Sequence, residues 1–213
     1  MKKYLLIFDF DGTIADTFNL ILEISNDLSD EFNYKKIQPN DVSFLKDHTL
    51  EEVIKHLKVP IINIPMILAK SRRELYKEIT TIQPIKGLKE VLNKFKSLSI
   101  PMGIITTNSN KNVLKFLQYN NLEVFDFIHS SSRIFGKDFT LKRISKRKHF
   151  PLENVIYIGD ETRDIAAAKK AGVKTIAVCW GYNSEKALLK QKPDFIVKDP
   201  DELNLLIQKN FLN

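Results

Sequence analysis

Six short apolar runs, separated by longer segments with helical periodicity, constrain the fold of this chain more than any other feature. Each run is rich in β-branched and aromatic residues, which favours a buried strand. The segments between them repeat apolar residues three and four positions apart, as an amphipathic helix does. Strands that alternate with helices predict a parallel sheet between two helical layers, an α/β sandwich. The runs are Tyr4–Phe8, Met102–Thr106, Phe125–His129, Val155–Gly159, Thr175–Cys179 and Phe195–Val197.

The interval between the first two runs breaks this rhythm. It exceeds ninety residues, far more than a simple crossover needs. Amphipathic stripes run from Phe18 to Leu28 and from Leu50 to Leu57, and a third helix is expected from about Pro65 to Ile79. We therefore predict that residues 17–82 form a small α-helical domain inserted after the first strand. Residues 1–16 and 83–213 would form the α/β core domain.

Composition excludes several classes of protein. Apolar residues make up 43% of the chain, which argues against disorder. The lone cysteine, Cys179, leaves no disulfide within the chain and no paired-cysteine metal site. No apolar run approaches the roughly 18 residues of a membrane span. A cytoplasmic protein without a membrane partner is expected.

The net charge of +7 comes almost entirely from one stretch, Arg133–Lys148, with seven basic residues and a single acidic one. The rest of the chain is close to neutral. No zinc-finger or RNA-recognition pattern accompanies the stretch, so we do not expect a nucleic-acid partner.

Carboxylates follow two of the runs. Asp9 and Asp11 end the first run, and Asp160 and Asp164 follow the fourth. Ligands bind at the carboxyl ends of parallel strands, and four acids gathered there would need a hard cation. The second run ends in Thr106–Ser109, whose hydroxyl and backbone N–H groups suit a phosphate. Lys137, directly after a glycine, offers a balancing charge.

In this combination the sequence resembles the haloacid dehalogenase superfamily of phosphohydrolases, and most closely its phosphoglycolate phosphatase and β-phosphoglucomutase branch. Residues 9–13, Asp-Phe-Asp-Gly-Thr, match the first motif of that family, and residues 159–164, Gly-Asp-Glu-Thr-Arg-Asp, match the fourth. Thr107 matches the second motif and Lys137 the third. The resemblance implies a Rossmann-like core with a small α-helical cap.

The resemblance also implies roles for these residues. Asp9 would be the nucleophile that forms an aspartyl-phosphate, and Asp11 the general acid and base. Mg²⁺ would be held by Asp9, the carbonyl oxygen of Asp11, Asp160 and Asp164. Thr107, the backbone N–H of Asn108 and Lys137 would bind the phosphoryl oxygens. An acid at position 11 favours a phosphate ester over a halogenated acid or a phosphonate.

Two motif assignments stay open at this point. The third motif of the family is usually Lys-Pro, whereas here Asp138 follows Lys137, so Arg133 or Lys142 could take the role. The paired Thr106 and Thr107 leave the register of the second motif uncertain by one residue. We favour Thr107, because strand alternation would turn Thr106 away.

The cap is expected to select the substrate. Lys46 and His48, together with Arg72 or Arg73, are the candidates to face the site, and residues 44–49 lie where the family carries a specificity loop. A cap that screens out large molecules favours a small phosphorylated metabolite, and the resemblance implies phosphoglycolate as one candidate.

Three other functions compete with the phosphatase. They are a β-phosphoglucomutase-like phosphotransferase, a nucleic-acid-binding protein that uses the basic stretch, and a catalytically silent scaffold. The sequence is compatible with a monomer or a homodimer.

Overall fold

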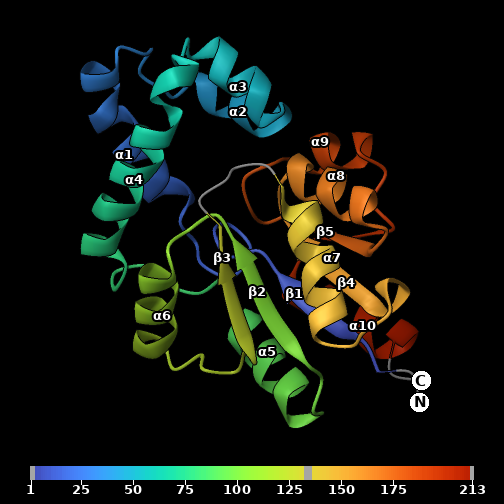
Figure 1. Cartoon of the computed structure of the whole chain (residues 1–213). Helices are drawn as coiled ribbons and strands as arrows, with labels where there is room; N and C mark the ends of the chain where they lie inside the picture. The colour runs from blue at the N-terminus through green and yellow to red at the C-terminus, as the bar shows by residue number, and fades with distance from the viewer. Residues whose placement is uncertain (1–2, 132–135, 212–213) are drawn as a thin grey trace.

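The computed structural model describes residues 3–131 and 136–211. Their strands form one parallel sheet in the order β3-β2-β1-β4-β5-β6 (Figure 1), which confirms the predicted α/β fold. The third strand begins at Phe127 rather than Phe125, and the other boundaries differ from prediction by at most one residue. The strands are β1 (Leu5–Phe8), β2 (Met102–Thr106), β3 (Phe127–Ser130), β4 (Val155–Gly159), β5 (Lys174–Val178) and β6 (Phe195–Val197).

Helices cover both faces of the sheet because β1 alternates its side chains between two apolar clusters. Leu6 and Phe8 pack in the cluster that includes α5, α6 and α10. Leu5 and Ile7 pack in the cluster that includes α7 and α8. These core helices, together with α9, are α5 (Leu88–Ser97), α6 (Asn110–Tyr119), α7 (Lys137–Arg147), α8 (Thr162–Ala171), α9 (Glu185–Lys190) and α10 (Pro200–Phe211).

Strand order determines where the polar motifs meet. β1 lies between β2 and β4, and Phe8 at its end is in register with Ile104 and Ile158. The segments that follow β1, β2 and β4 therefore begin at the same edge of the sheet. All three carry the polar residues that the sequence singled out.

The long interval between β1 and β2 is helical, as predicted. It contains α1 (Phe18–Phe32), α2 (Asp41–Asp47), α3 (Leu50–His56) and α4 (Ile64–Glu78), with a short 3₁₀ turn before α4. These cap helices stand beyond the edge of the sheet that carries the motifs (Figure 1). Part of α1 and α4 shares a buried cluster with the core, so the division at residues 17 and 82 stays a prediction.

One local expectation was wrong. Residues 44–49 were expected to form a loop, but residues up to Asp47 belong to helix α2. Leu45 of α2 is buried against Ile37 and Leu57, and this packing stabilises a helix too short to show a periodic stripe. Only His48 and Thr49 link α2 to α3, where Thr49 and Glu52 form a capping box.

None of the helices within the described residues is long and apolar enough to cross a bilayer.

Candidate functional site

A buried ion network lies at the end of β1. The Lys137 ammonium, on the first residue of α7, lies 2.9 Å from Asp9 Oδ2 and 2.7 Å from Asp164 Oδ1. The side chains of Lys137, Asp9 and Asp164 are only 3%, 4% and 1% exposed. Removing a charge from water at such a site is costly unless a partner compensates it, so these three groups depend on one another.

Asp160 completes an acidic group with Asp9 and Asp164. One carboxylate oxygen from each of the three lies within 4.8 Å of the other two. Three carboxylates and the single Lys137 ammonium leave two negative charges uncompensated by that network. A divalent cation has the charge to balance them, and oxygen donors are what hard cations prefer. The donor set fits Mg²⁺. Coordination of the metal by the carbonyl oxygen of Asp11 stays a prediction.

Two hydrogen bonds and two closely packed glycines hold the Asp160 carboxylate in place. Asp160 accepts hydrogen bonds from Thr13 Oγ1 at 2.5 Å and from the backbone N–H of Tyr182 at 2.7 Å. A Cβ atom at Gly12 would lie 2.3 Å from Asp160 Oδ2, and one at Gly181 would lie 2.2 Å from it. Glycine is therefore required at both positions for the two loops to close around this carboxylate.

The surroundings change how the acids titrate. Burial raises the pKa of Asp9 to about 7, with Lys137 opposing this shift and Asp164 adding to it. Burial also raises the pKa of Asp11 to about 6, against the hydrogen bond from Asn108. The pKa of Asp160 is raised well above its ordinary value, first by burial and then by Glu161 and Asp164. Without a cation, this site favours protonated carboxyl groups.

We expect the metal-free protein to lose stability as the pH rises from about 4 to 7. An acid with a raised pKa binds more protons in the folded than in the unfolded state, so the free energy of unfolding falls as the pH rises through that interval. For Asp11 the interval extends from the ordinary pKa of 3.8 to a pKa of about 6, and for Asp9 it extends from 3.8 to about 7. The thermal midpoint in EDTA should fall by about 5 °C or more.

The matched control for this measurement is Asp9→Asn, which removes one titrating carboxyl and should make the fall shallower. A midpoint that rises between these pH values in EDTA would contradict the raised pKa values.

Asn108 connects the second motif to Asp11. Its Nδ2 donates to Asp11 Oδ1 at 3.0 Å and to Oδ2 at 3.1 Å, a contact that the sequence did not suggest. The backbone N–H of Asn108, predicted to bind phosphate, donates instead to Thr106 Oγ1 at 2.9 Å. The Thr106 side chain is buried, whereas Thr107 lines the cavity above Asp11. Ser109 caps α6.

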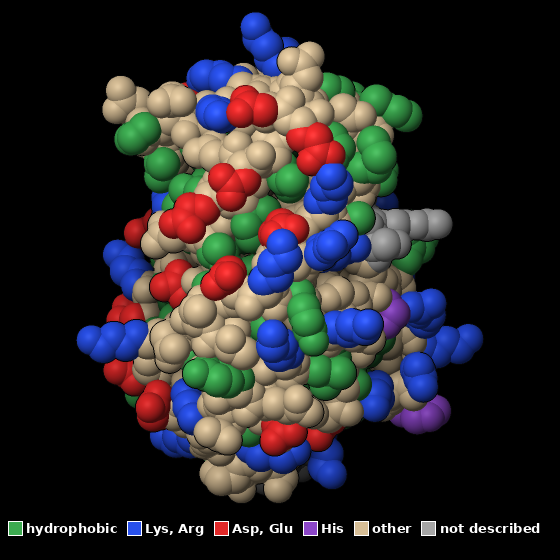
Figure 2. All heavy atoms as spheres, turned by 90° about the vertical axis from the view of Figure 1, so that its left-hand side faces the viewer, with side chains coloured by type: hydrophobic (Ala, Val, Ile, Leu, Met, Phe, Trp, Pro, Cys, Tyr) green, Lys and Arg blue, Asp and Glu red, His purple; other side chains and the backbone are tan. Residues whose placement is uncertain are grey.

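Of the three candidates for the third motif, Lys137 is placed in the site. Lys142 is exposed on α7, and Arg133 lies outside the described residues. Further basic residues of the stretch, among them Arg143, Lys146 and Arg147, are exposed on the same helix. On the face of the molecule shown in Figure 2, basic side chains are interspersed with acidic ones.

Two of the four predicted cap residues line the cavity, and two do not. His48 and Arg72 line the cavity. Arg72 Nη2 donates to the carbonyl oxygens of Thr107 and, at 3.2 Å, Ser131. Lys46 is not among the lining residues, because its ammonium lies 4.4 Å above the Phe18 ring and donates to Gly181 O. Arg73 is exposed.

Sequence reasoning missed Asn183, which joins the cap to the core. Its Oδ1 accepts a hydrogen bond from Thr162 N at 2.8 Å, at the start of α8. Its Nδ2 donates to the carbonyl oxygens of Lys46 at 3.1 Å and His48 at 2.9 Å. An asparagine in a turn is ordinary, so no signal in the sequence distinguishes this one.

A second pair that was missed lies within the fourth motif itself. Arg163 Nε donates to Glu161 Oε2 at 3.0 Å, and the pair lies at the floor of the cavity. Alternate acidic and basic residues at the start of a helix usually point to solvent. No pattern in the sequence indicates that this pair is largely buried.

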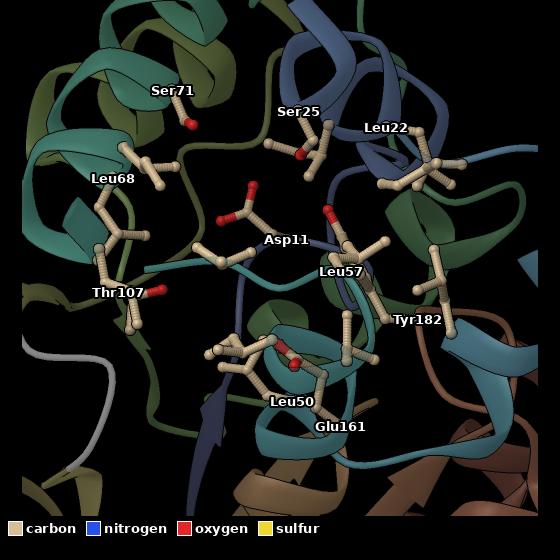
Figure 3. A pocket seen from close by; sticks show the side chains of 18 of the residues that line it. Asp11, Leu22, Ser25, Leu50, Leu57, Leu68, Ser71, Thr107, Glu161 and Tyr182 are labelled. Carbon is tan, nitrogen blue, oxygen red and sulfur yellow. The ribbon is translucent and has the colours of Figure 1, made fainter. Parts of the chain in front are cut away.

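The cavity lies between the cap and the motifs and has a volume of about 300 Å³. Figure 3 shows the Asp11 carboxylate rising into its centre, with Thr107 at one side and Tyr182 at the other. Side chains from α1, α3 and α4 form the walls. Asp11 therefore opens onto a space of small-molecule size.

Comparison with protein families gives a match to the haloacid dehalogenase-like hydrolases over residues 6–178. A phosphoglycolate phosphatase of Synechococcus elongatus is 29% identical over 93% of this chain and 94% of its own length. A putative pyrophosphatase PpaX of Caldanaerobacter subterraneus is 27% identical over 98% of this chain and 96% of its own.

Solved structures resemble the whole chain in fold. A predicted phosphatase from Clostridium acetobutylicum has a TM-score of 0.83 at 19% identity, covering 98% of this chain and 100% of that one. A haloacid dehalogenase-like hydrolase from Streptococcus pneumoniae has a TM-score of 0.80 at 22% identity, covering 97% of this chain and 99% of that one.

Proposed function

Because this chain belongs to the haloacid dehalogenase-like hydrolases, we propose that it is a phosphatase that hydrolyses a small phosphorylated metabolite, with Mg²⁺ as cofactor and an aspartyl-phosphate as intermediate. The names of its relatives make phosphoglycolate one candidate substrate and pyrophosphate another.

One observation carries the proposal: a buried carboxylate at a strand end, held beside a buried lysine and two further acids. Asp9 Oδ2 lies 2.9 Å from Lys137 Nζ, and Asp160 and Asp164 lie close enough to share a cation with it. Positive charge around a carboxylate is what a phosphoryl group needs when it approaches a nucleophile, because charge accumulates on its oxygens. A structural ion pair alone would not need the third and fourth members.

In the proposed first step, an Asp9 carboxylate oxygen attacks phosphorus and the ester P–O bond breaks. Asp11 gives its proton to the leaving alcohol oxygen, a role supported by its pKa of about 6 and by its position in the cavity. In the second step water attacks phosphorus, Asp11 takes up a proton, and the bond to Asp9 breaks to release phosphate. Lys137 and Thr107 would bind the phosphoryl oxygens.

A bound Mg²⁺ would be held by Asp9, Asp160 and Asp164 and would neutralise charge on the phosphoryl oxygens during both steps. Lys137 would keep its contact with Asp164 throughout and so stay close to the nucleophile.

We expect the protein to release inorganic phosphate from acetyl phosphate and p-nitrophenyl phosphate with Mg²⁺, and to lose at least about 10²-fold of this rate in EDTA. Free phosphate as the final product separates hydrolysis from the phosphotransferase alternative. Transfer of the phosphoryl group to a sugar phosphate, without release of phosphate, would contradict the proposal. Activity that persists in EDTA would contradict the role of the metal.

A further inference from the structure

The cap cavity has a chemical character that bears on the substrate. Figure 3 shows Leu68 and Ser71 of α4 facing Leu22 and Ser25 of α1 across the space above Asp11. Most other wall residues are apolar as well, including Leu50, Val53 and Ile67. Many of these side chains are only half-buried by the protein, so apolar surface remains available to a bound molecule.

Charged groups of the cavity lie at its floor or are already engaged. Arg72 donates to the carbonyl oxygen of Thr107, at the end where the phosphoryl group would bind. Arg163 is paired with Glu161. His48 is stacked on the Phe44 ring, with centroids 3.7 Å apart, and its Nδ1 lies 2.8 Å from Phe44 O. Among the described residues that line the cavity, none is a lysine.

A carboxylate or a second phosphate at the far end of the cavity would therefore lose its hydration without gaining a cation, which is unfavourable. Apolar groups would gain from the same surroundings. Two hydroxyls, of Ser25 and Ser71, point into this end, and no side-chain hydrogen bond within the described residues occupies either of them. They offer a hydrogen bond to a neutral polar group.

We propose that the leaving group of the substrate is an uncharged, largely apolar alcohol that occupies the cavity between α1, α3 and α4, with Ser25 and Ser71 available to a hydroxyl that it carries. This inference rests on the proposed function, since it presumes that the ester is cleaved above Asp11. It separates this chain from enzymes whose leaving group is an anion such as glycolate.

The test compares ethyl, butyl and hexyl phosphate with phosphoglycolate, in which a carboxylate replaces the methyl group of ethyl phosphate. With Mg²⁺ present, kcat/KM should rise about fourfold for each added methylene. The kcat/KM for phosphoglycolate should not exceed that for ethyl phosphate. A flat series, or phosphoglycolate ahead of hexyl phosphate, overturns the inference.

Hydrolysis of acetyl phosphate tests the proposed phosphatase activity independently of this inference. Hydrolysis of acetyl phosphate without hydrolysis of any alkyl phosphate overturns the inference alone. Failure to hydrolyse acetyl phosphate as well overturns the proposed function and the inference together.

A pair of variants on α4 locates the leaving group. Leu68→Asn keeps the size of a cavity-lining side chain but makes it polar, and it should lower the ratio of kcat/KM for hexyl over ethyl phosphate by about tenfold. Met66→Asn makes the same change on the outer side of the helix, where Met66 is 55% exposed, and should leave the ratio unchanged. The ratio is independent of the fraction of folded protein. An unchanged ratio in Leu68→Asn overturns the placement.

Discussion

Replacing Asp9 with asparagine lowers kcat for phosphate release by about 10⁴-fold or more, the scale of loss seen when a covalent nucleophile is removed. The neutral amide has almost the shape of the carboxylate but lacks its nucleophilic oxygen. Lys137 keeps its 2.7 Å contact with Asp164, so we expect the variant to fold. Phosphate release from acetyl phosphate, followed with saturating Mg²⁺, measures the effect.

Asp16→Asn is the control for this substitution. Asp16 is an exposed acid a few residues further along the same loop, and its loss should leave kcat within about twofold. Mass spectrometry of acid-quenched reactions adds an independent readout, because only chains with Asp9 should carry a phosphoryl group. An Asp9→Asn variant with wild-type activity would exclude this residue as the nucleophile.

Replacing Asp160 with asparagine should uncouple the protein from its metal. The wild type at a Mg²⁺ concentration about 100 times Kd gains about 2.7 kcal/mol of stability, equivalent to roughly 5–10 °C in thermal midpoint. The variant keeps an acceptor for Tyr182 N but loses one of the three carboxylates, so this shift should nearly vanish. Its kcat/KM should fall about 10³-fold.

Thermal melts with Mg²⁺ and with EDTA check the binding half of this prediction without any turnover. The Asp16→Asn variant should keep the full Mg²⁺-induced shift. An Asp160→Asn variant that is stabilised by Mg²⁺ as much as the wild type would show that the cation binds elsewhere.

The sequence allowed the fold to be predicted because its strands are short, apolar and separated by helices of the expected period. The location of the site followed from position, since Asp9, Thr107 and Asp160 each come directly after a strand, whereas their roles came from the resemblance to the haloacid dehalogenase superfamily. Parallel strands in this order bring those three ends together, so no knowledge of side-chain packing was needed.

Contacts between segments that are distant in the chain could not be predicted from the sequence. The sequence does not indicate that the first residues of the expected specificity loop, 44–49, belong to helix α2, because Leu45 packs on Ile37 and Leu57, which lie outside the helix. The hydrogen bonds from Asn108 to Asp11, and the placement of Lys46 against Phe18, depend on how two segments approach one another. Neither contact leaves a periodic or spaced pattern in the chain.

The hydrogen bonds of Asn183 have a consequence for how this enzyme can change over evolution. On the cap side both of its partners are carbonyl oxygens, those of Lys46 and His48, so these two hydrogen bonds do not depend on which side chains stand there. The side chain of Asp47 between them does matter, because it accepts a hydrogen bond from Ser184 Oγ at 2.5 Å and pairs with Lys186 at 3.1 Å. His48 can therefore be exchanged without loss of its hydrogen bond to Asn183, whereas position 47 needs an acid. Because His48 lines the cavity, substrate preference can change at this position while the cap stays docked on the core.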